Sequence, residues 1–363
     1  MLVVQVETDL TLNLHMAEKR DITIYDLADK LNISAATVSR ALNNHQGIKE
    51  KTRKRINDLA VEMGYRSNNF ASNLRRQKTN TIGVIVHELN STFITSVLSG
   101  IEKVATTANY DIIIGHSAES SIKESANAGN FFHKRVDGLI ASLAYDTEQL
   151  AHFDPYFNKK IPLVFFDRVP KNSSGIKVVI DNYKAGFEAT EHLIAQGCQH
   201  IYHITASLNR NVYADRVEGY KDALSKHGLA YSDDQLIITD FGEAASLEVA
   251  AKLIDKEIKP DGLFVSNDFC AAICIQSFKD AGLRVPGDIA VVGFNNDVIS
   301  KIIEPKLTTV NYCGREMGEV AARSLINSLN GIVTTGHTDT ITLKAELIIR
   351  ASSQRIRLKN EAN

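Results

Sequence analysis

The stretch TIYDLADKLNISAATVSRALNN, residues 23–44, decides the fold of the N-terminal part of the chain. Thr23 precedes an apolar face at helical spacing, and the acidic residue three positions later is typical of a capped helix start. Asn32 tolerates the left-handed backbone that a tight turn between helices needs. Ser34 then suits the cap of a second helix, Ala35 to Leu42. The spacing therefore predicts two short helices joined by a tight turn, a helix–turn–helix.

A third helix is expected at about Glu50–Met63, with Gly64 ending it. Each of the three helices has one apolar side, and the three sides can form a small common core. We therefore expect a helical domain over residues 21–66. Its predicted inward residues are Ile24, Leu27, Ala28, Leu31, Val38, Ala41, Leu42, Ile56, Leu59, Ala60 and Met63.

The charge of the chain is unevenly distributed. Residues 19–80 contain 13 Lys and Arg against 6 Asp and Glu, whereas the residues after 80 contain 28 against 34. A small basic domain on an acidic body indicates a nucleic-acid-binding module. The second helix can enter the major groove, where Arg40 can bind the two acceptors of guanine. The cations around the third helix that can neutralise phosphates are Lys49, Lys51, Arg53, Lys54 and Arg55.

After Thr81 short apolar runs alternate with amphipathic segments, which favours parallel strands with crossover helices. The pattern predicts an α/β core, a doubly wound parallel sheet in two similar halves that begin near Ile82 and Ile201. The expected strands are Ile82–Val86, Asp111–Ile114, Gly138–Ala141, Leu163–Phe166, Ile201–Ile204, Leu236–Thr239, Gly262–Val265 and Ala290–Gly293. The whole chain then divides into a disordered extension (1–20), the helical domain (21–66), a hinge helix or linker (67–80), the core (81–350) and a C-terminal tail (351–363).

Several classes of protein are not supported by the sequence. The 363 residues contain no run of 18 apolar residues, no basic apolar leader and only four cysteines, so we expect a cytoplasmic protein with no membrane partner. His203 lies in the expected strand Ile201–Ile204 and His200 directly precedes it; in a strand this spacing puts the two side chains on opposite faces, so they do not suit a shared metal. No assembled catalytic motif occurs, and we expect no enzyme activity, no cofactor and no metal.

The chain resembles the LacI/GalR family of transcriptional repressors over about residues 21–350. Besides the helix–turn–helix, the resemblance rests on NTIGVIVHELNSTF, RVDGLI, PLVFFDR, YADRVEGYKDAL, PDGLFVSND and GLRVPGDIAVVGFNND, in that order. The family implies a helix–turn–helix headpiece and a hinge helix. It also implies a two-lobed regulatory core, similar to periplasmic sugar-binding proteins, with the effector bound between the lobes.

The resemblance assigns DNA-contacting roles. In the family the first residues of the second helix read bases, but here they are Ala35 and Ala36, which are small. Thr37, Ser39 and Arg40 are therefore the expected hydrogen-bonding readers. The family's hinge helix wedges a leucine into the minor groove, and Leu74 matches it. The full candidate set is Thr23, Ser34, Ala35, Ala36, Thr37, Ser39, Arg40, Asn43, Lys49, Arg53, Asn69 and Leu74.

The resemblance also assigns an effector site. Arg216 matches the effector-binding arginine of the family, and Asn267 and Asn295 match positions that hold polar groups of the ligand. Asp167 is a similar candidate, and Phe93 can stack on a ring or on the apolar face of a sugar. Each has a structural alternative; for Asn267 it is the cap of a helix that follows a strand.

Together these observations predict a repressor, a homodimer that binds a pseudo-palindromic double-stranded DNA operator. Its affinity for the operator is expected to depend on a small-molecule effector, a sugar or sugar derivative. Two alternatives remain: a sugar-binding protein without DNA function, and an enzyme on a doubly wound fold. The sequence leaves open the effector, the direction of its effect, the operator, and the choice between dimer and tetramer.

Overall fold

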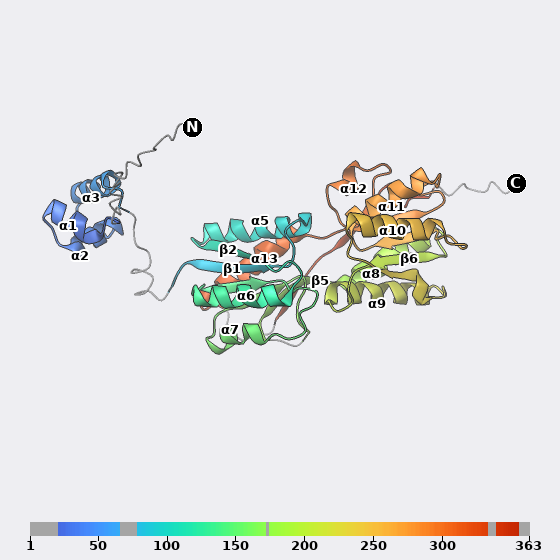
Figure 1. Cartoon of the computed structure of the whole chain (residues 1–363), viewed down its shortest axis with the longest axis horizontal. Helices are drawn as coiled ribbons and strands as arrows, with labels where there is room; N and C mark the ends of the chain where they lie inside the picture. The colour runs from blue at the N-terminus through green and yellow to red at the C-terminus, as the bar shows by residue number, and fades with distance from the viewer. Residues whose placement is uncertain (1–20, 66–77, 172–173, 333–338, 356–363) are drawn as a thin grey trace, which may run out of the picture. The chain divides into compact units, whose positions relative to one another are not determined.

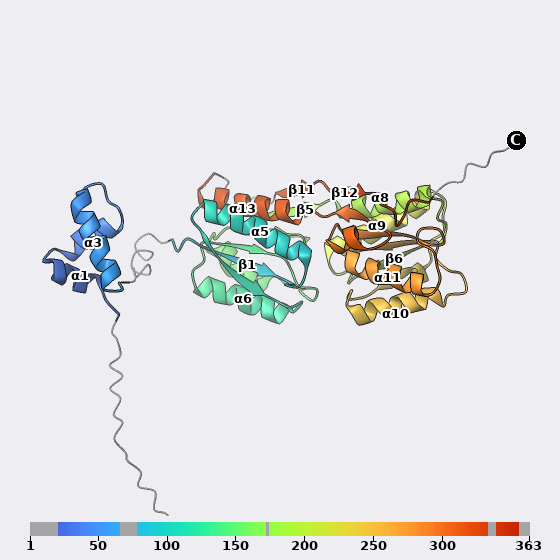
Figure 2. The ribbon, with the colours of Figure 1, turned by 90° about the horizontal axis from the view of Figure 1, so that it is seen from above.

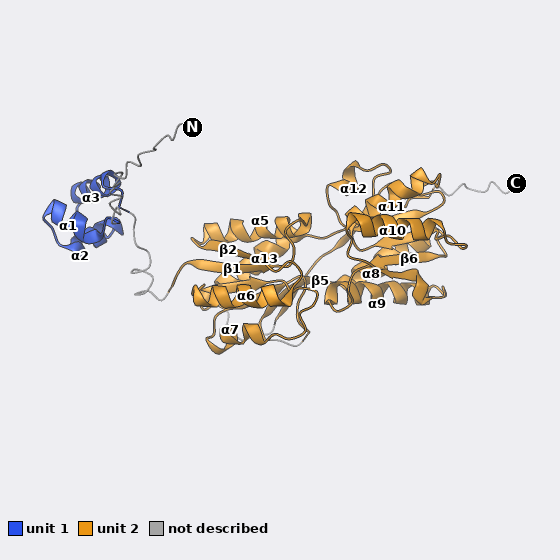
Figure 3. Ribbon diagram, in the orientation of Figure 1, with its two compact units in different colours: residues 1–77 blue, residues 78–363 orange. Residues whose placement is uncertain are grey.

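The computed structural model describes residues 21–65, 78–171, 174–332 and 339–355. The chain divides into two compact units between Gln77 and Lys78, the first helical and the second α/β (Figure 3). None of the helices in the described ranges is long and apolar enough to cross a membrane.

The first unit contains α1 (Ile24–Leu31), α2 (Ala35–Leu42) and α3 (Glu50–Glu62). The Thr23 hydroxyl accepts from the first turn of α1, and Asn32 has a left-handed backbone with φ of 54°. Both features are those that the sequence predicts for a tight interhelical turn. The predicted inward side chains pack into one cluster, centred on the buried Leu27, Ala28, Val38, Ala41, Ile56 and Ala60.

The second unit begins with a six-stranded sheet, here called lobe 1, in the order β11-β5-β4-β3-β1-β2. All its strand pairs are parallel. Helices α5 (Thr92–Thr107) and α13 (Gly314–Leu329) pack on one face, and α6 (Ser121–His133) and α7 (Asp154–Asn158) on the other (Figures 1 and 2). Its strands are β1 (Thr81–Val86), β2 (Asp111–His116), β3 (Gly138–Ala141), β4 (Leu163–Phe166), β5 (Ile176–Ile180) and β11 (Thr340–Leu343).

Lobe 2 is a second six-stranded sheet in the order β12-β10-β9-β8-β6-β7, parallel except for the β10–β12 pair. Helices α8 (Asn182–Ala195) and α9 (Asn211–Lys226) cover one face, and α10 (Glu243–Ile254) and α11 (Asp268–Asp280) cover the other (Figure 2). A short α12 spans Ile299–Ile302. The strands are β6 (Ile201–Thr205), β7 (Leu236–Ile238), β8 (Gly262–Val265), β9 (Ala290–Asn295), β10 (Thr308–Asn311) and β12 (Glu346–Ile348).

Three segments of chain connect the lobes. The chain passes from β5 of lobe 1 to α8 of lobe 2, returns from β10 to α13, and crosses again from β11 to β12. The two-lobed doubly wound core is as predicted, but the lobes are not the two contiguous halves expected from Ile82 and Ile201. Strands β5, β10, β11 and β12 were not predicted. Periodicity also does not identify the sheet to which a strand belongs, because that depends on pairing between segments far apart in the chain.

The ends of the core also differ from the predicted boundaries. Residues 351–355, expected to belong to a tail, pack against lobe 2: the Ser352 hydroxyl donates to the Val291 carbonyl, and the Arg355 guanidinium donates to the Pro286 carbonyl. Thr79, expected in the linker, donates its backbone N–H to the Asp137 carboxylate. Buried backbone groups need partners, and polar side chains at the ends of the core supply them here.

Candidate functional site

Most of the candidate base-reading residues lie on the solvent side of α2 or at its C-cap, whereas Ala35 packs against the core of the helical unit. Ala36, Arg40 and Asn43 are exposed, and Ala35, Thr37 and Ser39 are half-buried. The Ser34 hydroxyl accepts from the Thr37 backbone N–H at 3.2 Å and lies 2.8 Å from the Thr37 hydroxyl. Because the Ser34 and Thr37 hydroxyls are used in capping the helix, the side chains of Ser39 and Arg40 are the candidates that remain free of this capping role.

The candidate phosphate contacts lie at the start of α3. Lys49 is the exposed N-cap residue of this helix, and Arg53 is half-buried one turn later. Tyr25, in the first turn of α1, is a further exposed residue of this unit that was not among the candidates; it is 69% exposed. Its place on the polar side of a short helix could have been read from the sequence. Asn69 and Leu74 lie outside the described residues.

The carboxyl ends of strands from both lobes carry the polar residues of the interlobe junction, as expected for open α/β sheets. Arg216 of α9 is 2% exposed; its Nε donates to the Asn182 side-chain oxygen at 2.9 Å, and its guanidinium carbon lies 3.5 Å from the centre of the Phe294 ring. Gly186 permits this placement, because a Cβ there would overlap the Arg216 backbone. Burial lowers the pKa of Arg216.

Asp167 follows β4 and is buried, with φ of 58°. It accepts a hydrogen bond from the hydroxyl of Tyr312, which lies in the crossover after β10. Phe93 stacks on the Tyr312 ring, with the ring centres 4.1 Å apart. Burial raises the pKa of the Asp167 carboxyl. Two of the predicted effector residues, Asp167 and Phe93, are thus joined through a residue that the sequence analysis did not select.

The two predicted asparagines have different surroundings. The Asn267 side chain accepts from the Cys270 backbone N–H at 3.0 Å and caps α11, which is the structural alternative considered above. Asn295 ends β9 with φ of 117°, and its amide donates to Asp297 at 3.4 Å. Asn295, Phe93 and Tyr312 line one open hollow of about 500 Å³ between α5, α13 and the β9 loop.

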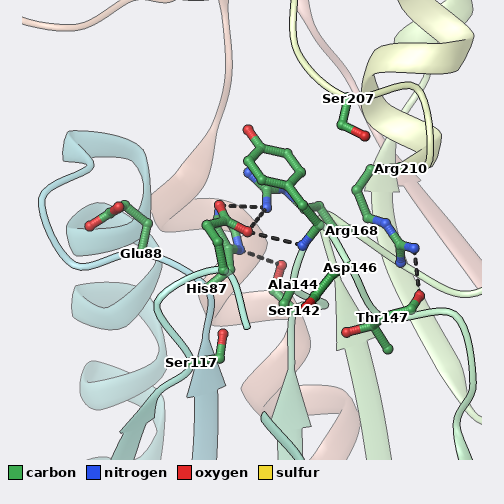
Figure 4. A network of polar contacts seen from close by, with 12 residues as sticks. His87, Glu88, Ser117, Ser142, Ala144, Asp146, Thr147, Arg168, Ser207 and Arg210 are labelled. Atoms are coloured by element: carbon green, nitrogen blue, oxygen red, sulfur yellow. Dashed lines mark hydrogen bonds and ion pairs between the residues drawn. The ribbon is translucent and has the colours of Figure 1, made fainter. Parts of the chain in front are cut away.

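A second polar group at the junction surrounds Arg168, which directly follows Asp167. Its Nη1 donates to both carboxylate oxygens of Glu119 at 2.8 Å. Its guanidinium carbon lies 4.0 Å above the Tyr145 ring, and Nη2 donates to the Tyr213 hydroxyl of lobe 2 at 3.4 Å. Figure 4 shows Arg168 with His87, Ser117 and Ser142, which follow or end neighbouring strands of lobe 1. Arg168 was not among the candidates, although it follows Asp167 in the motif FFDR. Its position at the end of a predicted strand was the feature of the sequence that could have indicated it.

The first turn of α9 binds lobe 1 directly. The Asn211 side chain accepts from the Val169 backbone N–H at 3.0 Å and donates to the Asp167 carbonyl at 3.1 Å. The Arg210 Nη2 donates to the Thr147 carbonyl at 2.6 Å. These bonds and the Arg168–Tyr213 contact link the lobes, so a ligand bound here would contact both.

A metal site finds no support among the described residues: no group of three or more His, Cys, Asp or Glu side chains there is placed to hold an ion. His203 is buried between the Tyr220 and Phe264 rings, while His200 is exposed before β6. Cys270 and Cys274 are buried in α11.

The chain has a helical unit with an exposed second helix, and then a two-lobed core with polar strand ends at the junction. This combination is typical of one class of protein, the DNA-binding regulators with a solute-binding core. Two sequence profiles match the chain accordingly. "Bacterial regulatory proteins, lacI family" matches residues 23–68, and "Periplasmic binding protein-like domain" matches residues 190–353.

Known proteins agree with these profiles. Catabolite control protein A of Priestia megaterium is 33% identical over 311 residues, which is 85% of this chain and 93% of the relative. The lac repressor dimer bound to operator and the anti-inducer ONPF has a TM-score of 0.82 at 22% identity, covering 93% of this chain and all of that one. The transcriptional regulator CelR in complex with cellobiose has a TM-score of 0.68 at 24% identity, covering 91% and 99%. The chain belongs to the LacI family and is a DNA-binding transcriptional regulator.

Proposed function

We propose that this protein is a homodimeric repressor whose affinity for a pseudo-palindromic operator is controlled by a small-molecule effector bound between the core lobes. The observation that carries the proposal is the junction itself: Arg216 and Asp167 are buried there, and side chains from both lobes bond across it. A ligand in such a place can favour one arrangement of the lobes, which is the requirement for control at a distance.

The headpiece supports the DNA-binding part of the proposal. Its exposed Arg40 on α2 and Lys49 at the start of α3 suit a base edge and a phosphate respectively. A dimer would present two such helices to two half-sites of an operator. The lac repressor in the structural comparison is a dimer bound to its operator. Because genomic DNA is the target, the proposed place of action is the bacterial cytoplasm.

The effector proposal is a sugar or sugar derivative, and two observations support it. Polar groups and stacked aromatic rings occur together at the junction, as in the Phe93–Tyr312 pair, and these suit the hydroxyls and apolar faces of a sugar. CelR, a structural neighbour, was solved in complex with the sugar cellobiose. Asn295, Asp167, Arg216, Phe93 and Asn267 are the proposed contacts, with Asn267 restricted by its capping bond.

The DNA-binding part is tested with the full chain and random duplex libraries. We expect selection of a two-fold symmetric site, with affinity that falls steeply as salt rises, because cations of the headpiece displace counterions. Selection of no common site, or binding without salt dependence, would contradict the proposal.

The effector part is tested by melting the protein with sugars, nucleobases and nucleosides, since a ligand specific for the folded state raises Tm. Hits are then added to the operator complex. We expect Arg216→Ala to abolish the change in operator affinity that the ligand causes while leaving ligand-free operator binding near normal. A variant that responds like the wild type would remove Arg216 from the site.

A further inference from the structure

Arg210, immediately before α9, is a buried cation without a counterion. Its side chain is 7% exposed, and its hydrogen bond goes to a neutral group, the Thr147 carbonyl. Its Nε is buried without a hydrogen-bond partner. A buried charge in this condition is costly, so it points to a group that binds there and completes its bonding.

The acidic side chains near Arg210 are bonded elsewhere. Glu119 pairs with Arg168 at 2.8 Å, and Asp146 accepts from the Ser121 backbone N–H at 2.6 Å. Glu124 is fully buried and is held by the Ala144 N–H, the Thr147 hydroxyl and the His152 ring. No described carboxylate forms an ion pair with Arg210.

The electrostatics agree with this geometry. Burial lowers the pKa of Arg210, and the positive charge of Arg168 lowers it further. The negative charges of Glu124, Asp146 and Glu119 raise the pKa, but the net shift is still downward. An added anion would reverse the imbalance.

The helix that begins after Arg210 adds to the positive potential. Helix α9 is 16 residues long and has no side-chain cap, whereas α8 and α11 are capped by Asp181 and Asn267. The uncapped N–H groups of a helix start favour a negative group. Figure 4 shows the Arg210 guanidinium of lobe 2 beside Thr147 of lobe 1. Ser207 of lobe 2 is also drawn there, with Arg168 and His87 of lobe 1 across the junction.

We propose that the ligand of the interlobe site carries an anionic group, a carboxylate or a phosphate, and that Arg210 and the start of α9 bind this group. The inference rests on the proposed function, because it specifies the chemical class of the effector in that same site. Arg168 has its own carboxylate, so Arg210 is the residue that discriminates between an acidic ligand and its neutral counterpart.

The experiment compares matched ligands on full-length wild type and variants. Each of glucose, galactose, mannose and fructose is tested as the neutral sugar and as its phosphates; the uronates of the first three separate carboxylate from phosphate. Inorganic phosphate and sulfate are tested alone at millimolar concentration. We expect at least one anionic compound to raise Tm and its neutral counterpart to bind roughly tenfold to a hundredfold more weakly, as for one charge-assisted hydrogen-bonded contact.

The variants localise the effect. Arg210→Gln should remove the preference for the anion, and Arg210→Lys should keep part of it because the charge is retained. Arg284→Gln is the matched control, since Arg284 is a surface arginine paired with Asp288, and it should behave as wild type. Without ligand, the Tm of Arg210→Gln should change little, because loss of the hydrogen bond to the Thr147 carbonyl is offset by removal of a buried charge that has no counterion.

Three results would overturn the inference: no anion raises Tm, a neutral sugar binds as tightly as its acidic derivative, or Arg210→Gln keeps the preference. A large fall in the Tm of ligand-free Arg210→Gln would also overturn it, since Arg210 would then be structural. Operator binding, measured in parallel, separates these results from failure of the proposed function. If the protein binds its operator and responds to a neutral ligand alone, the proposed function stands and the anionic specificity is wrong.

Discussion

The Tyr312 hydroxyl donates a hydrogen bond to the Asp167 carboxylate and so joins the crossover after β10 to the carboxyl end of β4. Both residues are buried, and Phe93 of α5 stacks on the same tyrosine. The bond therefore holds a connecting segment against lobe 1 at the place where a ligand is proposed to bind.

Replacing this tyrosine tests the contribution of the bond to stability. Tyr312→Phe keeps the ring but leaves the buried Asp167 carboxyl without its donor, so we expect the free energy of unfolding to fall by about 1–3 kcal/mol. Urea denaturation measures it. Tyr183→Phe is the control, because the Tyr183 hydroxyl also donates to a carboxylate, Asp222, at an exposed site; its loss should be smaller. If both variants lost the same free energy of unfolding, burial of the Tyr312–Asp167 hydrogen bond would add nothing to its contribution.

Arg40 is expected to read a base. Arg40→Ala should weaken binding to the selected operator by about 1–3 kcal/mol and relax the preference at one position, while non-specific binding changes little. Competition titrations with single-base operator variants measure both effects. Lys30→Ala removes an exposed charge at the end of α1 and is the control. A uniform loss across all sequences would instead assign Arg40 to a phosphate.

Leu74 lies outside the described residues, and its proposed role rests on the resemblance of the hinge segment. Leu74→Ala should lower operator affinity and reduce the bend of the bound DNA, because an apolar wedge that opens a base step is lost. Permuted operator fragments report the bend. Ser72→Ala in the same segment is the control. If Leu74→Ala weakened effector binding as much as operator binding, the residue would belong to a core.

His203 makes the core sensitive to acid. Its pKa is about 3 in the folded protein because of burial, below the ordinary value of 6.5. Between these values the unfolded chain binds a proton and the folded chain does not, so stability is lost as the pH falls below about 6.5. The loss from this residue should reach about 2 kcal/mol by about pH 5.

The variant His203→Phe keeps an aromatic ring beside Tyr220 and Phe264 without a titrating group. We expect it to lose less stability than wild type between neutral pH and about pH 5, as measured by urea denaturation at each pH. His200→Gln, at the exposed position before the same strand, should retain the loss of the wild type. An unchanged pH dependence in His203→Phe would refute the assignment.

Local patterns were sufficient for the headpiece. The capped start at Thr23, the left-handed Asn32 and the three apolar faces each involve neighbours within a few residues, and the structure has all of them. Eight strands of the core were predicted from their apolar runs, but the buried strands β5 and β10 were not. These features depend on periodicity and turn chemistry, which the sequence carries directly.

The junction could be predicted only in part, because its contacts join residues far apart in the chain. Arg216 and Asp167 were selected by resemblance, whereas Tyr312, the partner of Asp167, was not selected. Arg210 lies 63 residues from Thr147 in the sequence, and nothing local indicates that its guanidinium is buried beside that carbonyl. Asn267 shows the opposite case, since the expected helix cap explains its side-chain bond.

The threefold passage of the chain between the lobes has a consequence for synthesis on the ribosome. Lobe 1 lacks α13 and β11 until residues 314–343 have been translated, although its first five strands end at Ile180. The nascent chain must therefore keep an open strand edge and a sheet face covered only by α5 while nearly all of the other lobe is made, and a chaperone that binds apolar surface is expected to act in this interval.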